Sequence, residues 1–125
     1  MPFRPSLVMQ AIRWLHGLAA NKGTPLPGGT PRKGYASYTE FSQQFGLWPV
    51  HPNPIRDEFL STVVKECAAR GWPDFAALVI HEPGTSRDGP GDGWYAAHGL
   101  TPGDLVAWRK YRDDCWARAK EIAIP

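Results

Sequence analysis

The fold is decided by residues 35–81, which read YASYTEFSQQFGLWPVHPNPIRDEFLSTVVKECAARGWPDFAALVIH. The stretch begins with a short helical pattern, because Phe41 and Phe45 lie one turn apart and share a helix face. Gly46 follows directly and can adopt the left-handed conformation that ends many helices. The pattern predicts a short helix over 39–45.

A second, longer helix is predicted after a connector that has three prolines between 48 and 54. Asn53 suits the cap and Pro54 the first turn, where the missing amide proton of proline does no harm. Apolar residues then recur every four positions: Ile55, Phe59, Val63 and Cys67, widened by Leu60 and Val64. The helix ends at the Gly-Trp-Pro turn of residues 71–73, so residues 35–71 are predicted to form a helix-turn-helix.

A β-hairpin is predicted over residues 75–96. Residues 75–81 (FAALVIH) are apolar and precede a segment rich in proline and glycine, which favours a short buried strand. Residues 82–93 form a polar loop with four glycines. Trp94 and Tyr95 are then expected to return as the second strand.

Two further helices are predicted on either side of this region. The first runs over 6–20 with Ser6 as its cap, because a hydroxyl there can accept from the open amides of the first turn. Residues 21–34 hold four glycines and three prolines without periodicity, which is typical of a long loop. The last helix is predicted over 102–122, behind a sequence at 101–104 that resembles a capping box.

Together these elements predict one α+β domain over residues 1–125, a small winged helix-turn-helix-like fold that is mainly helical with one β-hairpin. A length of 125 residues and a hydrophobic fraction of 42% fit a single core. The side chains expected in that core are Val8, Ile12, Leu15, Phe41, Phe45, Phe59, Val63, Leu78, Ile80, Trp108 and Tyr111.

Composition argues against several classes of protein. No run approaches the roughly 18 apolar residues of a membrane span, and the opening residues lack the unbroken core of a signal peptide. We therefore expect a cytoplasmic protein without a membrane partner. Cys67 and Cys115 form no C-x-x-C pair and are expected as reduced core residues. The four histidines lie in separate elements and no nucleophile motif occurs, so we expect no metal, no cofactor and no enzymatic activity.

The formal charge of +2 hides an asymmetry along the chain. Residues 1–56 carry six Lys/Arg and one acid, a net +5, whereas residues 57–125 carry eight bases and eleven acids, a net −3. A positive region attracts phosphate, because each neutralised phosphate releases counterions. The charge therefore permits nucleic-acid binding without requiring it.

A helix pair followed by a hairpin describes a winged helix-turn-helix, in which the second helix enters the DNA major groove. In order and spacing, residues 35–108 resemble the DNA-binding domain of the alkylguanine-DNA alkyltransferases and their alkyltransferase-like relatives. The resemblance rests on residues 35–47, the helix with Arg56, Val79-Ile80, Gly93-Trp94-Tyr95-Ala96 and Gly99-Leu100. It implies a Tyr-rich turn at the first helix and an arginine, Arg56, that probes the base stack.

The same resemblance implies that alkyl transfer is absent. If Val79 and Ile80 match the family's valine and the apolar residue after it, Ala76 stands where the acceptor cysteine would be. Ala77 then stands where the activating histidine would be. Transfer needs a thiolate, and alanine has no nucleophile. The pattern also resembles small modules of phages and restriction-linked loci, which implies a defence or counter-defence setting.

The favoured prediction is a non-enzymatic nucleic-acid-binding module with DNA as its partner. The residues expected to contact nucleic acid are Tyr38, Arg56, Lys65 and Arg87. Two carboxylates follow Arg56 directly, at Asp57 and Glu58, and they would repel a DNA phosphate.

The alternative is a phage or mobile-element anti-defence protein that binds and inhibits a host defence protein. Trp116 lies with Arg109 and Arg112 beside the main apolar stripe of the last helix, and Trp and Arg are enriched at interface hot spots. Two interpretations of Trp116 are open: it covers a neighbouring helix, or it contacts a partner. The sequence does not determine the oligomeric state.

Overall fold

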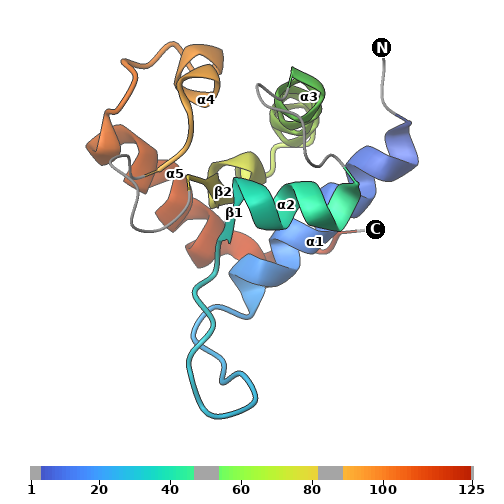
Figure 1. Ribbon diagram of the computed structural model, residues 1–125, viewed down its shortest axis with the longest axis vertical. Helices are drawn as coiled ribbons and strands as arrows, with labels where there is room; N and C mark the ends of the chain where they lie inside the picture. Colours follow the sequence, from blue (N-terminus) through green and yellow to red (C-terminus); the bar gives the residue numbers. More distant parts are fainter. Residues whose placement is uncertain (1–3, 47–53, 82–88, 125) are drawn as a thin grey trace.

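The computed structural model of the protein describes residues 4–46, 54–81 and 89–124. Figure 1 shows helices gathered around a two-stranded sheet. This arrangement confirms a small α+β fold that is mainly helical. None of the helices in these ranges is long and apolar enough to cross a membrane.

Helix α1 spans Pro5–Ala20, close to the predicted 6–20. The prediction that Ser6 is its cap is wrong, because Arg4 holds that position and its side chain makes no capping bond. Proline suits the first helical position, where its backbone is preset and no amide proton needs a partner, and this explains the earlier start. The buried face carries Val8, Ala11, Ile12, Leu15 and Ala19, and it includes the three side chains of this helix that were expected in the core.

The predicted loop at 21–34 contains a small hairpin. Pro25 and Pro31 form an antiparallel bridge, and the Leu26 amide donates to the Thr30 carbonyl at 2.7 Å. We call residues 22–33 the basic hairpin, because its charged residues are all cations: Lys22, Arg32 and Lys33. The basic hairpin extends away from the helices in Figure 1.

The sheet differs from the predicted hairpin over 75–96. Strand β1 (Ala36–Ser37) pairs in parallel with strand β2 (Val79–Ile80), so that Ala36 lies opposite Val79. The residues before β2 form a short 3-10 helix, η1 (Phe75–Leu78), and all four of them are buried. Asp74 caps η1 by accepting a hydrogen bond from the Ala76 amide, which turns this apolar segment into a helical turn. The prediction of a β-hairpin is therefore wrong.

Trp94 and Tyr95 lie in helix α4 (Asp92–Ala97) and not in a second strand. The chain does return beside β2, where the His81 amide donates to the Gly89 carbonyl at 2.9 Å. Both aromatic side chains are buried although they are consecutive. Successive side chains of a strand point to opposite faces, so a strand covered on one face cannot bury both, whereas a short helix set into the body can.

Helix α2 spans Tyr38–Phe45 and starts one residue earlier than predicted. Ser37 and Glu40 form a capping box, in which each side chain accepts from the backbone amide of the other at 3.1 Å. Gly46 ends the helix in the left-handed conformation, with φ 69°, as predicted. The box places Tyr38 in the first turn, directly after β1.

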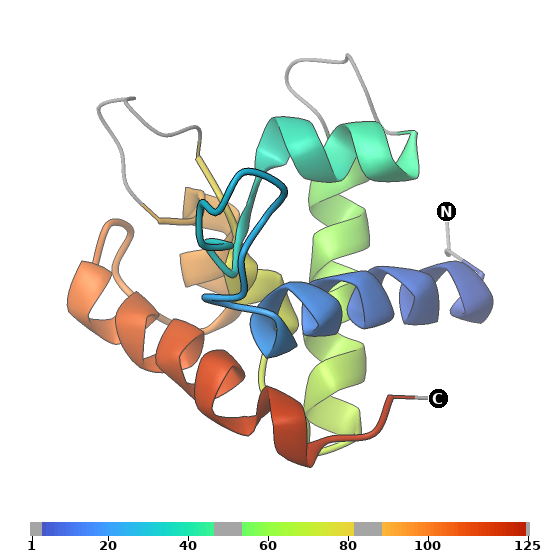
Figure 2. The same ribbon diagram turned by 90° about the horizontal axis from the view of Figure 1, so that it is seen from below.

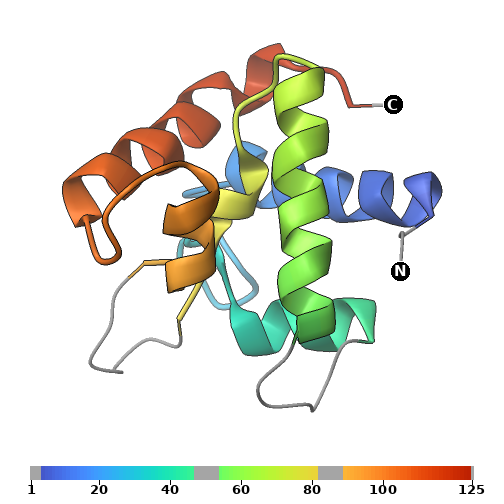
Figure 3. The same ribbon diagram turned by 90° about the horizontal axis from the view of Figure 1, so that it is seen from above.

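Helix α3 spans Pro54–Ala69 and confirms the predicted second helix. The expected cap, Asn53, lies outside the described residues. Phe59, Val63 and Cys67 are fully buried along one face, at the predicted four-residue spacing. Figure 3 shows α2 running across the N-terminal end of α3.

Helix α5 (Leu105–Arg118) starts later than the predicted 102–122. Its cap is Asp104 and not Thr101: the Asp104 carboxylate accepts from the Ala107 amide at 3.1 Å. Gly103 has φ 83°, which is incompatible with a right-handed helix and sets this later start. The end of the predicted helix is a 3-10 turn, η2 (Ala119–Glu121).

The core is centred on η1, which contacts α1, α3 and α5. Figure 2 shows α1 crossing α3, with α5 alongside them. The expected core side chains are all buried except Phe45 and Tyr111, which are half-buried. Both lie at the edge of the core in aromatic contacts, Phe45 against Phe59 and Tyr111 against Trp94.

Candidate functional site

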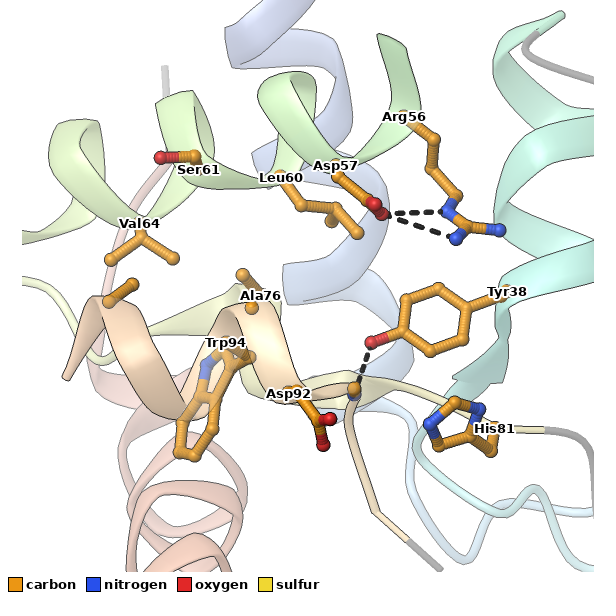
Figure 4. A pocket seen from close by; sticks show the side chains of 13 residues that line it. Tyr38, Arg56, Asp57, Leu60, Ser61, Val64, Ala76, His81, Asp92 and Trp94 are labelled. Carbon is orange, nitrogen blue, oxygen red and sulfur yellow. Dashed lines mark hydrogen bonds and ion pairs between the residues drawn. The ribbon is translucent and has the colours of Figure 1, made fainter. Parts of the chain in front are cut away.

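A cavity of about 470 Å³ lies between the N-terminal half of α3, the start of α2 and helix α4. Figure 4 shows Leu60 and Val64 reaching from α3 toward Ala76, with Tyr38 and Arg56 together at the other end. We call it the helix-pair cavity. One wall is apolar, with Leu60, Val64 and Ala76 facing Trp94. The opposite end is polar and aromatic, and it contains Tyr38, Arg56, Asp57 and His81.

Tyr38 closes the polar end of the helix-pair cavity. Its hydroxyl accepts a hydrogen bond from the Gly91 amide at 2.7 Å, which ties the start of α2 to the segment before α4. The His81 ring meets the Tyr38 ring edge to face, with 5.3 Å between the ring centroids. Burial raises the pKa of Tyr38 above its ordinary value, so the phenol is neutral at physiological pH.

Arg56 lies over the ring of this tyrosine. Its guanidinium carbon is 4.5 Å from the centroid of the Tyr38 ring, and its Nη2 is 3.1 Å from Oδ1 of Asp57. The side chain of Arg56 is 15% exposed, whereas that of Asp57 is 62% exposed. The structure thus brings Tyr38 and Arg56 together, as parts of one stacked and ion-paired cluster.

The other two predicted nucleic-acid contacts do not join this cluster. Lys65 is exposed on α3 and does not line the helix-pair cavity. Arg87 lies outside the described residues. The cavity instead contains Asp92, which the sequence analysis did not predict as a site residue. Asp92 lies in the first turn of α4, whereas the sequence predicts a loop at this position and a strand at Trp94 and Tyr95.

Ala76 lines the helix-pair cavity, whereas Ala77 is fully buried with its carbonyl bonded to Trp108 Nε1 at 2.9 Å. The two cysteines are fully buried and do not line the cavity. Burial raises the pKa of Cys67 to about 12 and also raises the pKa of Cys115. Both side chains are therefore protonated thiols of the core near neutral pH.

Asp74 supports the floor of the cavity through a buried network that sequence reasoning missed. Its Oδ2 accepts from Trp94 Nε1 at 2.7 Å and lies 2.6 Å from Nε2 of His98. Its Oδ1 accepts from the Ala76 amide at 3.0 Å. The Pro-Asp pair before an apolar run was the one local signal, because aspartate at that position is a common cap.

The residues predicted for a protein partner lie elsewhere, on α5. Trp116 is half-buried, and its Nε1 donates to the Gly34 carbonyl at 2.9 Å. Lys22 Nζ and the Arg112 guanidinium each lie 4.5 Å from the centroid of its ring. Trp116 thus holds the base of the basic hairpin, while Arg109 is exposed on the same helix.

The helix-pair cavity can bind a ligand through stacking and hydrogen bonds. It offers two aromatic surfaces, one arginine, and the carboxylates of Asp57 and Asp92. Among the residues described, no group of His, Cys, Asp or Glu side chains could hold a metal ion. The chain matches no family model, no curated protein and no solved structure.

Proposed function

We propose that the protein is a DNA-binding module of helix-turn-helix type whose helix-pair cavity accepts a base turned out of the double helix. The observation that carries this proposal is the position of the cavity, between α3 and α4, with the start of α2 at the end of the cavity where α3 begins. A recognition helix presents this end to DNA. A base displaced there would enter the cavity directly.

The size and lining of the cavity support a planar ligand. Its volume of about 470 Å³ falls within the usual range for small-molecule sites. Proteins read an extruded base by stacking and by hydrogen bonds to its edge. Tyr38 and Trp94 supply aromatic surface, and Asp92 supplies an acceptor that favours a base with an amino group.

Ala76 supports binding without chemistry. The alkyltransferase resemblance implies a reactive thiol at this position, and the side chain here is a methyl group in the cavity wall. An alkylated base could enter and leave unchanged. In duplex DNA that contains alkylated guanine, we expect no transfer to the protein, which intact-mass measurement tests for Cys67 and Cys115.

A titration of labelled duplexes at low salt tests the proposal. We expect a duplex with one mismatch to bind more tightly than the matched duplex, because an unpaired base costs less to extrude. Ser61→Trp, which fills the cavity from α3, should remove this preference. Ala69→Trp is the matched control, because Ala69 is exposed at the far end of the same helix. The absence of a gel shift at tens of micromolar protein would overturn the proposal.

The cluster at the polar end gives a second test. Arg56→Ala should weaken binding by about 1–3 kcal/mol if the guanidinium reaches a base edge. Asp57→Asn should strengthen it, because the substitution removes a carboxylate near the DNA phosphates and frees Arg56 from its ion pair. Unchanged affinity for both variants would place the interface away from the start of α3.

The α5 surface favours one other function, inhibition of a host defence protein. Val106 is 65% exposed there, next to the exposed Arg109 and Lys110. Under this alternative, a pull-down from host lysate retains a protein after nuclease treatment, and Arg109→Glu abolishes the capture while Arg56→Ala does not.

A further inference from the structure

A second cavity, of about 570 Å³, lies between α1, the basic hairpin and the start of α2. We call it the hairpin groove. Its apolar surface comes mainly from Trp14, Leu18, Leu26, Pro31 and Tyr35. Its cations are Arg13 on α1 with Arg32 and Lys33 on the basic hairpin. The groove therefore combines an apolar and aromatic wall with a basic rim.

The basic hairpin is held in place, so the groove is preformed. Arg32 Nη1 donates to Thr24 Oγ1 at 2.9 Å and to the Pro25 carbonyl at 2.7 Å. At the base of the hairpin, Trp116 donates to Gly34, where a Cβ atom would lie 2.8 Å from Trp116 Nε1. These contacts set the distance between the hairpin and α1 before any ligand binds.

The charge of the hairpin groove is positive. Three cations line it, against the single carboxylate of Glu40. One oxygen of that carboxylate accepts from the Ser37 amide in the capping box of α2. Arg13 and Lys33 are exposed, so phosphate groups can reach them. A positive excess of this kind attracts a phosphate backbone through counterion release.

The aromatic residues favour a nucleic acid over an acidic peptide. Trp14 lies against Phe45, with the ring centroids 5.7 Å apart, and its accessible part lines the groove together with Tyr35. Bases stack on such surfaces without sequence preference. Ser37 lines the groove and Tyr38, the next residue, lines the helix-pair cavity, so the start of α2 contributes to both sites.

We propose that the hairpin groove binds one strand of a nucleic acid, with phosphates on Arg13 and Lys33 and a base against the aromatic wall. This inference rests on the proposed nucleic-acid function and adds a second contact to it. The helix-pair cavity then selects the base, whereas the hairpin groove supplies affinity that does not depend on sequence.

The test compares salt dependence in matched variants, with a labelled oligonucleotide of twenty thymidines as the probe. Arg13→Gln/Lys33→Gln removes two of the three exposed groove cations and leaves Arg32, which holds the hairpin together. Lys110→Gln/Lys120→Gln removes two exposed cations from the C-terminal helical region. Each lost phosphate contact reduces the slope of log Kobs against log salt by about 0.7 for a single strand. We expect the groove variant to lose about 1.4 of that slope and at least tenfold in affinity at 50 mM salt. The control variant should match the wild type.

Two outcomes overturn the inference. If the groove and control variants lose the same slope, the contact is a general charge effect. If a peptide of alternating glutamate and leucine binds in a groove-dependent manner and the oligonucleotide does not, the occupant is an acidic protein segment.

The mismatch preference separates this inference from the proposed function. Groove variants should keep the preference for a mismatched duplex that Ser61→Trp removes. Binding with that preference and an unchanged salt slope refutes the groove alone. Groove-dependent binding of the oligonucleotide without mismatch preference refutes the cavity alone and supports the groove.

Discussion

The helix-pair cavity and the hairpin groove both place cations beside aromatic rings, but they differ in how those cations are used. In the cavity, Arg56 stacks on Tyr38, pairs with Asp57 and is 15% exposed. In the groove, Arg13 and Lys33 remain exposed on the rim. Counting charges along the chain does not separate these cases. The exposure of each side chain decides which cations can meet a phosphate.

The two sites also rest on different supports. The cavity is built on the core, through Asp74 and the apolar face of α3. The groove depends on one hairpin that Trp116 holds at its base. A substitution in one region should therefore leave the other region intact. The loss in the free energy of unfolding should be larger for side chains that are buried in the core.

The largest expected effect is a loss of folding stability from a substitution in the core, on the buried face of α3. Phe59 is fully buried between Phe41 and Phe45, so Phe59→Ala should lower the free energy of unfolding by about 3–5 kcal/mol. Leu26→Ala on the basic hairpin is the matched control, because Leu26 is 41% exposed, and it should cost less than about 1 kcal/mol. Urea unfolding measures both, and equal losses would show that the hairpin is part of the core.

The next effect concerns the buried network. Asp74→Ala should cost about 3 kcal/mol, because it leaves the ring nitrogens of Trp94 and His98 and the Ala76 amide without their acceptor. Asp74→Asn keeps one acceptor oxygen and should cost less. If both variants unfold at the urea concentration of the wild type, solvent already satisfies these groups.

A smaller effect is expected at the base of the hairpin. Gly34→Ala adds a methyl group that meets Trp116 and Lys22, at a backbone φ of 81°, and should cost about 1–3 kcal/mol. Gly28→Ala is the control: φ is 97°, but nothing lies within 4 Å of the added atom. The difference between the two melting temperatures isolates the clash, and equal values would mean that Trp116 and Lys22 move aside.

The smallest expected effect is a fall in the free energy of unfolding at alkaline pH. The pKa of Cys67 is raised to about 12 from 9.0, so above pH 9 the unfolded thiol loses its proton while the folded one keeps it. Stability should therefore fall as the pH rises, by about 1 kcal/mol between pH 9 and 10 from this thiol. Cys67→Ser removes the titration and should flatten the slope in urea unfolding at these pH values. If the free energy of unfolding of the variant falls with pH as steeply as that of the wild type, other groups cause the loss of stability.

Local patterns were enough for most of the helices. Phe59, Val63 and Cys67 predicted a face of α3 that is buried, and Gly46 predicted the end of α2. The same reasoning failed for Trp94 and Tyr95, because the partner of β2 is β1, more than forty residues earlier in the chain. Pairing between strands so far apart in the chain produces no pattern within a short stretch of sequence.

The site residues divide in the same way. Tyr38 and Arg56 were predicted together and lie together, but the sequence did not show that the arginine would face the ring and Asp57. Asp74 and Asp92 were not predicted as site residues, because both depend on α4. Trp94 of α4 bonds to the Asp74 carboxylate, and Asp92 lies in the first turn of this helix. The basic hairpin was predicted as a loop, and its backbone pairing and its contact with Trp116 were absent from the prediction.

Four helices, α1, α2, α3 and α5, could be predicted from sequence, together with the turns at glycine and the uneven charge of the chain, because these depend on neighbouring residues and on composition. Tertiary structure alone decided the parallel pairing of β1 with β2, the helical state of α4 and the two cavities. Each of these joins segments that are distant in the chain. Their energies come from burial and hydrogen bonds that exist only once those segments have packed together.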